Sequence, residues 1–272
     1  MRRVVDRALR AAGYRLAPYR APSTLHDLRP GFRSDYNAEA YPLIERVRAQ
    51  TMLSYPNLVA LYEQVRHVEA AGVPGAFVEC GVWKGGAAGL LAAANLARGA
   101  RRRHLHLFDS FDDMPEPDPA RDGGAALREF YDRSGRDPSR PFTGALTAVP
   151  GVYDAIGGPG SAAECERLIV GELGYPAPYL HVHAGWFQDT VAPAAPSIGE
   201  IALLRLDGDL YASTRTCLEA LYGQVARGGI VVVDDYGAYA GCRRAVDEFL
   251  AERGERPFLA YSDPHCRYWQ KC

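Results

Sequence analysis

The stretch Ile201-Ala-Leu-Leu-Arg-Leu-Asp-Gly-Asp-Leu-Tyr211 decides the fold of this chain. It begins as an apolar run typical of a buried strand and ends in two acidic residues, Asp207 and Asp209, which are separated by one glycine. The later stretch Gly229-Ile-Val-Val-Val-Asp-Asp235 repeats the pattern and also ends in two acids. If the two runs are neighbouring parallel strands, their carboxyl ends bring four carboxylates to the point where open α/β sheets bind ligands.

Four carboxylates at one point repel each other unless a cation or shared protons neutralise them. Asp234 and Asp235 complete the set that Asp207 and Asp209 begin. Carboxylate oxygens are hard ligands of the kind that Mg²⁺ prefers in proteins. We therefore predict a divalent metal site at this edge of the sheet.

Composition places the chain among ordinary globular proteins. It has 272 residues, 47% of them apolar and 24% charged, which is enough for one large domain or two small ones. A net charge of −2 gives no broad attraction for nucleic acid or an anionic membrane. The six cysteines form no C-x-x-C pair, and no apolar stretch reaches the ~18 residues of a membrane span. We expect a cytoplasmic protein with free thiols.

The order of the predicted elements indicates a single α/β domain over residues 51–272. Residues 1–50, punctuated by prolines, are expected to form either an arm over a neighbouring subunit or the substrate pocket, or a leader without a fixed place. We predict strands at 76–80, 105–109, 179–183, 201–206, 229–233, 257–261 and 266–271, and helices at 54–72, 87–97, 125–132 and 161–173. Two further helices are expected before Gly228 and beyond Asp235.

Five strands from alternating β/α units and a closing antiparallel hairpin give seven strands. This is the layout of the seven-stranded Rossmann-like class I methyltransferase sheet, with helices on both faces. Residues 112–160 are rich in Pro, Gly and charge, and we expect this insertion to take part in substrate recognition.

The turn after the first strand has an acid where a dinucleotide-binding turn has glycine. Its pattern is E-x-G-x-x-x-G through Glu79, Gly81 and Gly85, and a carboxylate there repels a diphosphate. It suits a cationic ligand such as the amino and sulfonium end of S-adenosylmethionine, although an ordinary strand-to-helix turn is the simpler reading of the glycines alone. Asp109, at the end of the second strand, is placed to bond ribose hydroxyls of an adenosine cofactor.

Six motifs together resemble the macrocin-type sugar O-methyltransferases of antibiotic biosynthesis, over about residues 50–271. They are Thr51-Met52, Phe77-Val-Glu-Cys-Gly-Val-Trp-Lys-Gly-Gly86, Leu107-Phe-Asp-Ser-Phe111, Gly185-Trp-Phe-Gln-Asp-Thr190, Leu206-Asp-Gly-Asp-Leu-Tyr211 and Val233-Asp-Asp-Tyr236. The resemblance implies an enzyme that uses S-adenosylmethionine and Mg²⁺ to methylate a deoxysugar hydroxyl on a macrolide or aminocoumarin. It also suggests a homodimer or higher homo-oligomer.

The same resemblance implies roles for individual residues. Asp207, Asp234 and Asp235 are expected to hold the metal, and Asp209 is expected to act as general base, with Asp207 as a second catalytic carboxylate. The cofactor is expected to contact Thr51, Met52, Glu79, Gly81, Trp83, Gly85, Asp109, Ser110, Gly185 and Trp186.

Several alternatives stay open on the sequence. A catechol or phenol acceptor fits a carboxylate site as well as a sugar does, because such sites chelate vicinal hydroxyls. Asp207-Gly-Asp209 also has the D-x-D form of metal-dependent glycosyltransferases, and a non-catalytic binding subunit is the third possibility. His181 and His183 alternate on a strand and are expected to be packed rather than to be ligands, while His265 could serve as a second base.

Overall fold

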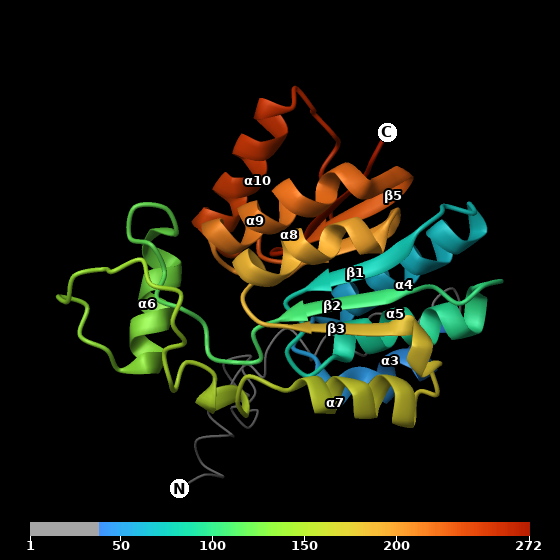
Figure 1. Cartoon of the computed structure of the whole chain (residues 1–272), viewed down its shortest axis with the longest axis horizontal. Coiled ribbons are helices and arrows are strands. Elements are labelled where there is room, and N and C mark those ends of the chain that lie inside the picture. Colours follow the sequence, from blue (N-terminus) through green and yellow to red (C-terminus); the bar gives the residue numbers. More distant parts are fainter. Residues whose placement is uncertain (1–37) are drawn as a thin grey trace, which may run out of the picture.

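A seven-stranded mixed sheet forms the centre of the computed structural model, which describes residues 38–272 (Figure 1). The strand order is β3-β2-β1-β4-β5-β7-β6; the first five strands are parallel, and β7 runs antiparallel to both of its neighbours. The strands are β1 (Ala76–Cys80), β2 (Leu105–Asp109), β3 (Leu180–Ala184), β4 (Ile201–Leu206), β5 (Val225–Val233), β6 (Ala260–Tyr261) and β7 (Arg267–Gln270). The predicted seven-stranded fold with its closing hairpin is confirmed.

Helices cover both faces of the sheet (Figure 1). One face packs against α3 (Ala40–Val47), α4 (Tyr55–Ala70) and α5 (Gly86–Arg98), and the other against α8 (Phe187–Ile198), α9 (Tyr211–Leu221) and α10 (Ala240–Glu252). The remaining helices are α6 (Gly123–Ser134), α7 (Ala162–Glu166) and the short turns η3 (Arg48–Gln50), η4 (Asp154–Ile156), η5 (Arg167–Glu172), η6 (Ala177–Tyr179) and η7 (Tyr222–Gln224). Each face of the sheet thus has its own apolar core.

Local sequence explains where the first helices begin and how closely they pack. Ser54 caps α4 because its hydroxyl accepts a hydrogen bond from the Asn57 amide at 3.2 Å. In α5, a Cβ at Gly86 would lie 2.5 Å from the carbonyl oxygen of Gln50, so only glycine fits there. The small residues of α5 let the segment that contains α3 lie directly against it.

The structure differs from the predicted elements at four places. The stretch 187–198 is the helix α8, although Pro193 and Pro196 within it argue against a helix. Strand β5 begins at Val225, so the helix predicted to reach Gly228 ends earlier. The strand predicted at 257–261 is reduced to two residues, and the helix predicted at 161–173 widens into a π-helical turn after Glu166. In α8, packing of Val191, Ala195 and Ile198 in the apolar core outweighs the local propensity of the two prolines.

The N-terminal arm contains an ordered helix that was not predicted, and the insertion contains the helix predicted at 125–132. Residues 40–47, counted with the N-terminal arm from sequence, form α3, whose Ala40, Ile44 and Val47 are completely buried. The rest of the predicted arm, residues 1–37, lies outside the described residues. The insertion carries α6 and a small core of Phe130, Val149 and Val152, and it extends beyond the carboxyl ends of β1 and β2 (Figure 1).

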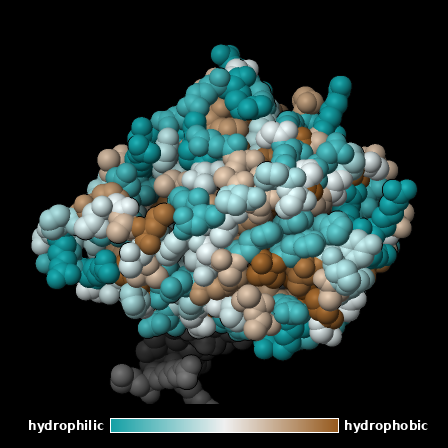
Figure 2. Space-filling view, in the orientation of Figure 1, coloured by the Kyte–Doolittle hydropathy of each residue, from teal (hydrophilic) through white to brown (hydrophobic). Residues whose placement is uncertain are grey.

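The outer surface of the sheet edge is less covered than its centre. Strand β3 is an edge strand whose residues are half-buried or exposed, and Figure 2 shows apolar side chains gathered along it. Of the helices in residues 38–272, none has the length and apolar character needed to cross a membrane.

Candidate active site

A cavity of about 360 Å³ lies at the carboxyl ends of β1, β4 and β5. The strand order reverses between β1 and β4, and a crevice forms at such a reversal because the chain leaves the two strands in opposite directions. The cavity is lined from the β1–α5 turn, the ends of β2 and β4, the segment after β5, and the insertion. This location confirms that the paired acids of the two apolar strands face one pocket.

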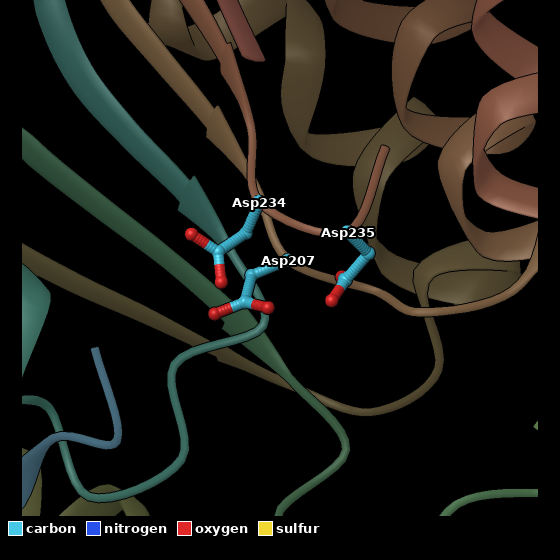
Figure 3. A group of neighbouring side chains, drawn as sticks. All are labelled: Asp207, Asp234 and Asp235. Carbon is cyan, nitrogen blue, oxygen red and sulfur yellow. The ribbon is translucent and has the colours of Figure 1, made fainter. Parts of the chain in front are cut away.

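Three carboxylates converge in this cavity, and we call Asp207, Asp234 and Asp235 the acidic triad. Each offers a carboxylate oxygen, and these atoms lie within 4.8 Å of one another. Figure 3 shows the three carboxyl groups close together, one from the end of β4 and two from the end of β5. Oxygens so spaced fit a small divalent cation. The structure therefore brings together the three residues expected to hold a metal.

A buried arginine lies beneath the acidic triad. Arg205 is only 1% exposed, and its Nη1 donates to Asp207 Oδ2 at 2.8 Å and to Glu79 Oε1 at 2.7 Å, while its Nη2 lies 3.0 Å from Asp234 Oδ1. Burial disfavours the guanidinium charge, but the three carboxylates outweigh this and raise the pKa of Arg205. The side chain is therefore a permanent internal cation.

Glu79 has one oxygen that bonds to protein and one that does not. Oε1 accepts from Arg205, whereas Oε2 is buried without a hydrogen-bond partner among the described residues. Burial raises the pKa of Glu79 to about 8, although Arg205 opposes the shift. A buried carboxylate oxygen without a partner is costly unless a ligand donates to it, and Glu79 lines the cavity, so it is suited to a cationic or hydrogen-bond-donating ligand.

The glycine of the β1–α5 turn is required by a close backbone approach. At Gly81 the angle φ is +90°, and a Cβ would lie 1.7 Å from the carbonyl oxygen of Asp207. The neighbouring amide of Asp207 donates to the Cys80 carbonyl at 2.8 Å. Glycine at this position thus lets the turn that carries the expected cofactor residues touch the loop that carries the acidic triad.

Asp209 stands beside the triad in a strained backbone conformation. Its φ of 59° lies in the left-handed region, which non-glycine residues rarely adopt, and its amide donates to Asp235 Oδ2 at 3.0 Å. Burial, together with the nearby Asp207 carboxylate, raises the pKa of Asp209 to about 8. Burial and its neighbours raise the pKa of Asp235 too, and raise that of Asp234 to about 6. The site carries more acid than Arg205 neutralises.

Most residues expected to contact the cofactor line the cavity. They are Thr51, Met52, Glu79, Gly81, Trp83, Asp109, Ser110 and Trp186. Gly85 and Gly185 do not line it: Gly85 is the left-handed residue before α5, where a Cβ would press on Cys165, and the Gly185 amide donates to the Asp109 carbonyl. These two glycines shape the turn before α5 and the turn after β3.

Asp109, which is predicted to bond the ribose of the cofactor, also accepts hydrogen bonds from the protein backbone. Its Oδ2 accepts from the amides of Val82 and Trp83 at 2.6 and 2.9 Å, and its Oδ1 accepts from the Phe111 amide at 2.7 Å. The carboxylate thereby fixes the β1–α5 turn against β2. Because a carboxylate offers about four lone pairs, it can still accept bonds from a ligand.

The insertion and α10 form the other end of the cavity. Tyr239 donates to Glu129 Oε2 at 2.6 Å, and Arg133 contacts the second oxygen of Glu129 at 2.5 Å, so the three side chains form a polar cluster near Asp209. Tyr153 and His265 also line the cavity. Glu129, Arg133, Tyr153 and Tyr239 thus approach Asp209 from elements far apart in the sequence.

Histidines gather away from this cavity. His104 and His106 on the β2 side face His181 and His183 on β3, with ring nitrogens 2.8 Å apart in the first pair and 3.2 Å in the second. The rings stack, with centroids of His106 and His181 4.5 Å apart. His181 and His183 are packed and hydrogen-bonded, as expected from their strand positions.

Sequence reasoning missed several residues of the site. Arg205 lies inside the apolar run that predicts β4, and a charge within a run that must be buried is the signal that points to it. Asn57, whose Nδ2 donates to Asp234 Oδ1 at 2.7 Å, carried no signal because it lies on a helix far away in sequence. The same holds for the polar cluster of Glu129, Arg133 and Tyr239.

Comparisons with known proteins agree with this geometry. The family model Macrocin-O-methyltransferase (TylF) matches residues 33–133 and 172–271, which begins before the expected limit of 50 and includes the first part of the insertion. The 8-demethyl-8-(2,3-dimethoxy-alpha-L-rhamnosyl)-tetracenomycin-C 4'-O-methyltransferase of Streptomyces olivaceus is 34% identical over 82% of this chain and 76% of its own length. Demethyldecarbamoylnovobiocin O-methyltransferase of Streptomyces niveus is also 34% identical, with the same coverage.

Solved structures that are similar to this chain are also methyltransferases. The O-methyltransferase NovP is 30% identical and superposes with a TM-score of 0.66 over 82% of each chain. The calicheamicin methyltransferase CalS11, at 22% identity and a TM-score of 0.53, covers 90% of this chain and 96% of its own and shares the fold.

Proposed function

The chain belongs to the macrocin-O-methyltransferase (TylF) family and is an O-methyltransferase. From this premise we propose that it transfers the methyl group of S-adenosylmethionine to a sugar hydroxyl of a glycosylated natural product. We propose Mg²⁺ as its metal. The names of its relatives describe O-methylation of a rhamnosyl tetracenomycin and of a novobiocin precursor. Family membership excludes the D-x-D glycosyltransferase and the non-catalytic subunit considered from sequence.

One observation carries the proposal: a single cavity is lined by two neighbouring acidic groups that suit two different cations. The buried Glu79 Oε2 has no partner in residues 38–272, which fits the cationic end of S-adenosylmethionine. The acidic triad offers three oxygens within 4.8 Å, which fits Mg²⁺. The residues present therefore match both groups that the fold family implies.

In the proposed reaction, Asp207, Asp234 and Asp235 hold the metal and Asp209 removes the proton of the acceptor hydroxyl. When bound, Mg²⁺ lowers the pKa of a coordinated hydroxyl and S-adenosylmethionine supplies the methyl group as an electrophile. Asp209 is suited to the proton transfer because it borders the triad without belonging to it. His265, which also lines the cavity, is the alternative base.

The other cavity residues position the reactants. Trp83 and Trp186 offer flat apolar surfaces near Asp109 for an adenosine, and we assign the cofactor to this end. The polar cluster of Tyr239, Glu129 and Arg133 offers hydrogen bonds to a hydroxylated ring. Methyl transfer requires oxygen, carbon and sulfur in line, so this positioning is a large part of the proposed rate enhancement.

The test is transfer of a labelled methyl group from S-adenosylmethionine to a panel of glycosylated and phenolic acceptors, with Mg²⁺ and with a chelator. We expect methylation of a glycosylated acceptor that stops when the metal is removed. Asp207→Asn and Asp209→Asn are expected to abolish turnover, while Asp247→Asn, on the outer part of α10, keeps it. Wild-type turnover with unchanged metal dependence in both site variants would refute the assignment, and transfer only to catechols would replace the sugar acceptor.

A further inference from the structure

We propose that Arg205 is a positioning residue that orients carboxylates of both ligand sites, Glu79 for the cofactor and two members of the acidic triad, Asp207 and Asp234, for the metal. The inference rests on the proposed function. It assigns to one buried side chain the task of fixing which oxygen each carboxylate presents to the cavity.

The sheet places Arg205 between the two sites. In the register of β1 and β4, Glu79 lies directly opposite Arg205, and the amide of Asp234, one residue past β5, donates to the Leu206 carbonyl at 2.9 Å. The guanidinium consequently contacts acids from three adjacent strand ends. One side chain thus contacts the residue expected to bind the cofactor and two residues expected to bind the metal.

The bonds to protein use one oxygen of each carboxylate. Arg205 donates to Oε1 of Glu79 and Oδ2 of Asp207, and Asn57 donates to Oδ1 of Asp234, against which Arg205 Nη2 lies as an ion pair at 3.0 Å. The amide of Asp209 occupies Oδ2 of Asp235 in the same way. These bonds leave the second oxygen of each acid for a ligand, so each carboxylate is presented in a fixed rotation.

The chemistry of arginine suits this task. Its planar fork holds nitrogens at fixed relative positions and stays charged, whereas a lysine ammonium is a single point charge on a flexible stem. A buried ion pair is by itself weak evidence for stability, because desolvation offsets much of the attraction. Residues that orient metal ligands from behind typically change metal affinity 10–100-fold when replaced. The arrangement is therefore better explained by ligand positioning than by fold stability.

The chain offers a matched control for the loss of a buried guanidinium. Arg103 is 11% exposed and contacts Glu69 Oε1 at 2.6 Å, and it also donates to the carbonyls of Gly75 and Val73. It precedes β2, at the end of the sheet away from the cavity, and does not line the pocket. Arg103→Lys therefore removes a comparable fork without touching either proposed ligand site.

The experiment measures binding of S-adenosylhomocysteine and of Mg²⁺ to the whole chain by calorimetry, with Mn²⁺ paramagnetic resonance as a second metal readout. Arg205→Lys is expected to weaken both ligands by about 10-fold or more, whereas Arg103→Lys lowers the melting temperature and leaves both affinities at the wild-type level. Wild-type affinities in a folded Arg205→Lys protein would overturn the inference. Failure of the wild-type protein itself to bind either ligand would overturn the proposed function instead.

A second variant covers the case in which Arg205→Lys does not fold. Glu79→Gln has the same shape as Glu79 and keeps an oxygen that accepts from Arg205, so it is expected to fold. The guanidinium then has Asp207 and Asp234 as its carboxylate partners and is drawn toward them. We expect Mg²⁺ binding to weaken severalfold in this variant even though Glu79 is not a metal ligand; unchanged Mg²⁺ affinity would overturn the inference.

Discussion

Acidification should destabilise this protein through one buried imidazole, His106. The residue is 5% exposed, and the rings of His181 and His183 lie 4.5 and 5.5 Å from its own ring, measured between centroids. Burial, and then the neighbouring imidazoles, lower the pKa of His106 from 6.5 to about 3. The unfolded chain therefore binds a proton at this residue at a pH where the folded chain does not.

The sign and size of the effect follow from proton linkage. Because the folded-state pKa is depressed, the stability is fully present above about pH 6.5 and is lost as the pH falls from there toward 3. At pH 5, which is about 1.5 units below the unfolded pKa, the loss attributable to His106 is about 2 kcal/mol at ~1.4 kcal/mol per unit. His181 and His183, whose pKa values burial also lowers, add to the loss in the same direction.

Urea unfolding at a series of pH values tests this reasoning, with His106→Phe as the comparison. Phenylalanine suits the position because Phe108 already stacks on His183, with ring centroids 4.3 Å apart. We expect the difference in unfolding free energy between the two chains to change by about 2 kcal/mol between about pH 7.5 and pH 5, with the wild type losing more. The raised carboxylate pKa values are shared by both chains and cancel. Parallel loss of stability in the two chains would refute the assignment to His106.

Three other predictions concern packing and accessibility. Gly81→Ala should lower the unfolding free energy by about 3 kcal/mol or more in chemical denaturation, whereas Gly72→Ala, with open space at its Cβ, costs only about 1 kcal/mol. Asp113→Ala frees two backbone amides of the insertion, so limited proteolysis there should accelerate while the sheet stays intact. A thiol reagent should modify only Cys272 in the native protein and all six cysteines after denaturation; reaction of a second thiol would contradict the buried state of the rest.

The sequence was sufficient to predict the acidic triad because the physical signal was local. A carboxylate directly after a buried strand is costly, and parallel strands place their carboxyl ends together, so Asp207 had to meet the acids that follow β5. Glu79 was predicted from a different local signal, an acid in place of the first glycine of a dinucleotide-binding turn, and its buried Oε2 without a partner in the described chain is consistent with a ligand-binding role. The position of each carboxylate could be predicted from the sequence. Which of its two oxygens bonds to protein depends on tertiary contacts.

Features built from distant segments could not be predicted in this way. Helix α8 contains Pro193 and Pro196, and only the burial of Val191, Ala195 and Ile198 against the sheet and its neighbouring helix explains why it forms. The polar cluster around Glu129 depends on α6 of the insertion lying beside α10. No period or spacing encodes such a contact, because the two elements are joined only by the fold.

Charge balance connects the missed arginine with the predicted acids. Five carboxylates, namely the acidic triad, Asp209 and Glu79, surround the cavity end, and Arg205 supplies a single positive charge in contact with three of them. The raised pKa values of Glu79 and Asp209 express the remaining excess of acid. A purely structural ion-pair network has no need of this excess, because unpaired buried charge costs several kcal/mol. The excess instead supports the proposed site for two cationic ligands, in which we infer that Arg205 holds the acids in place before either ligand arrives.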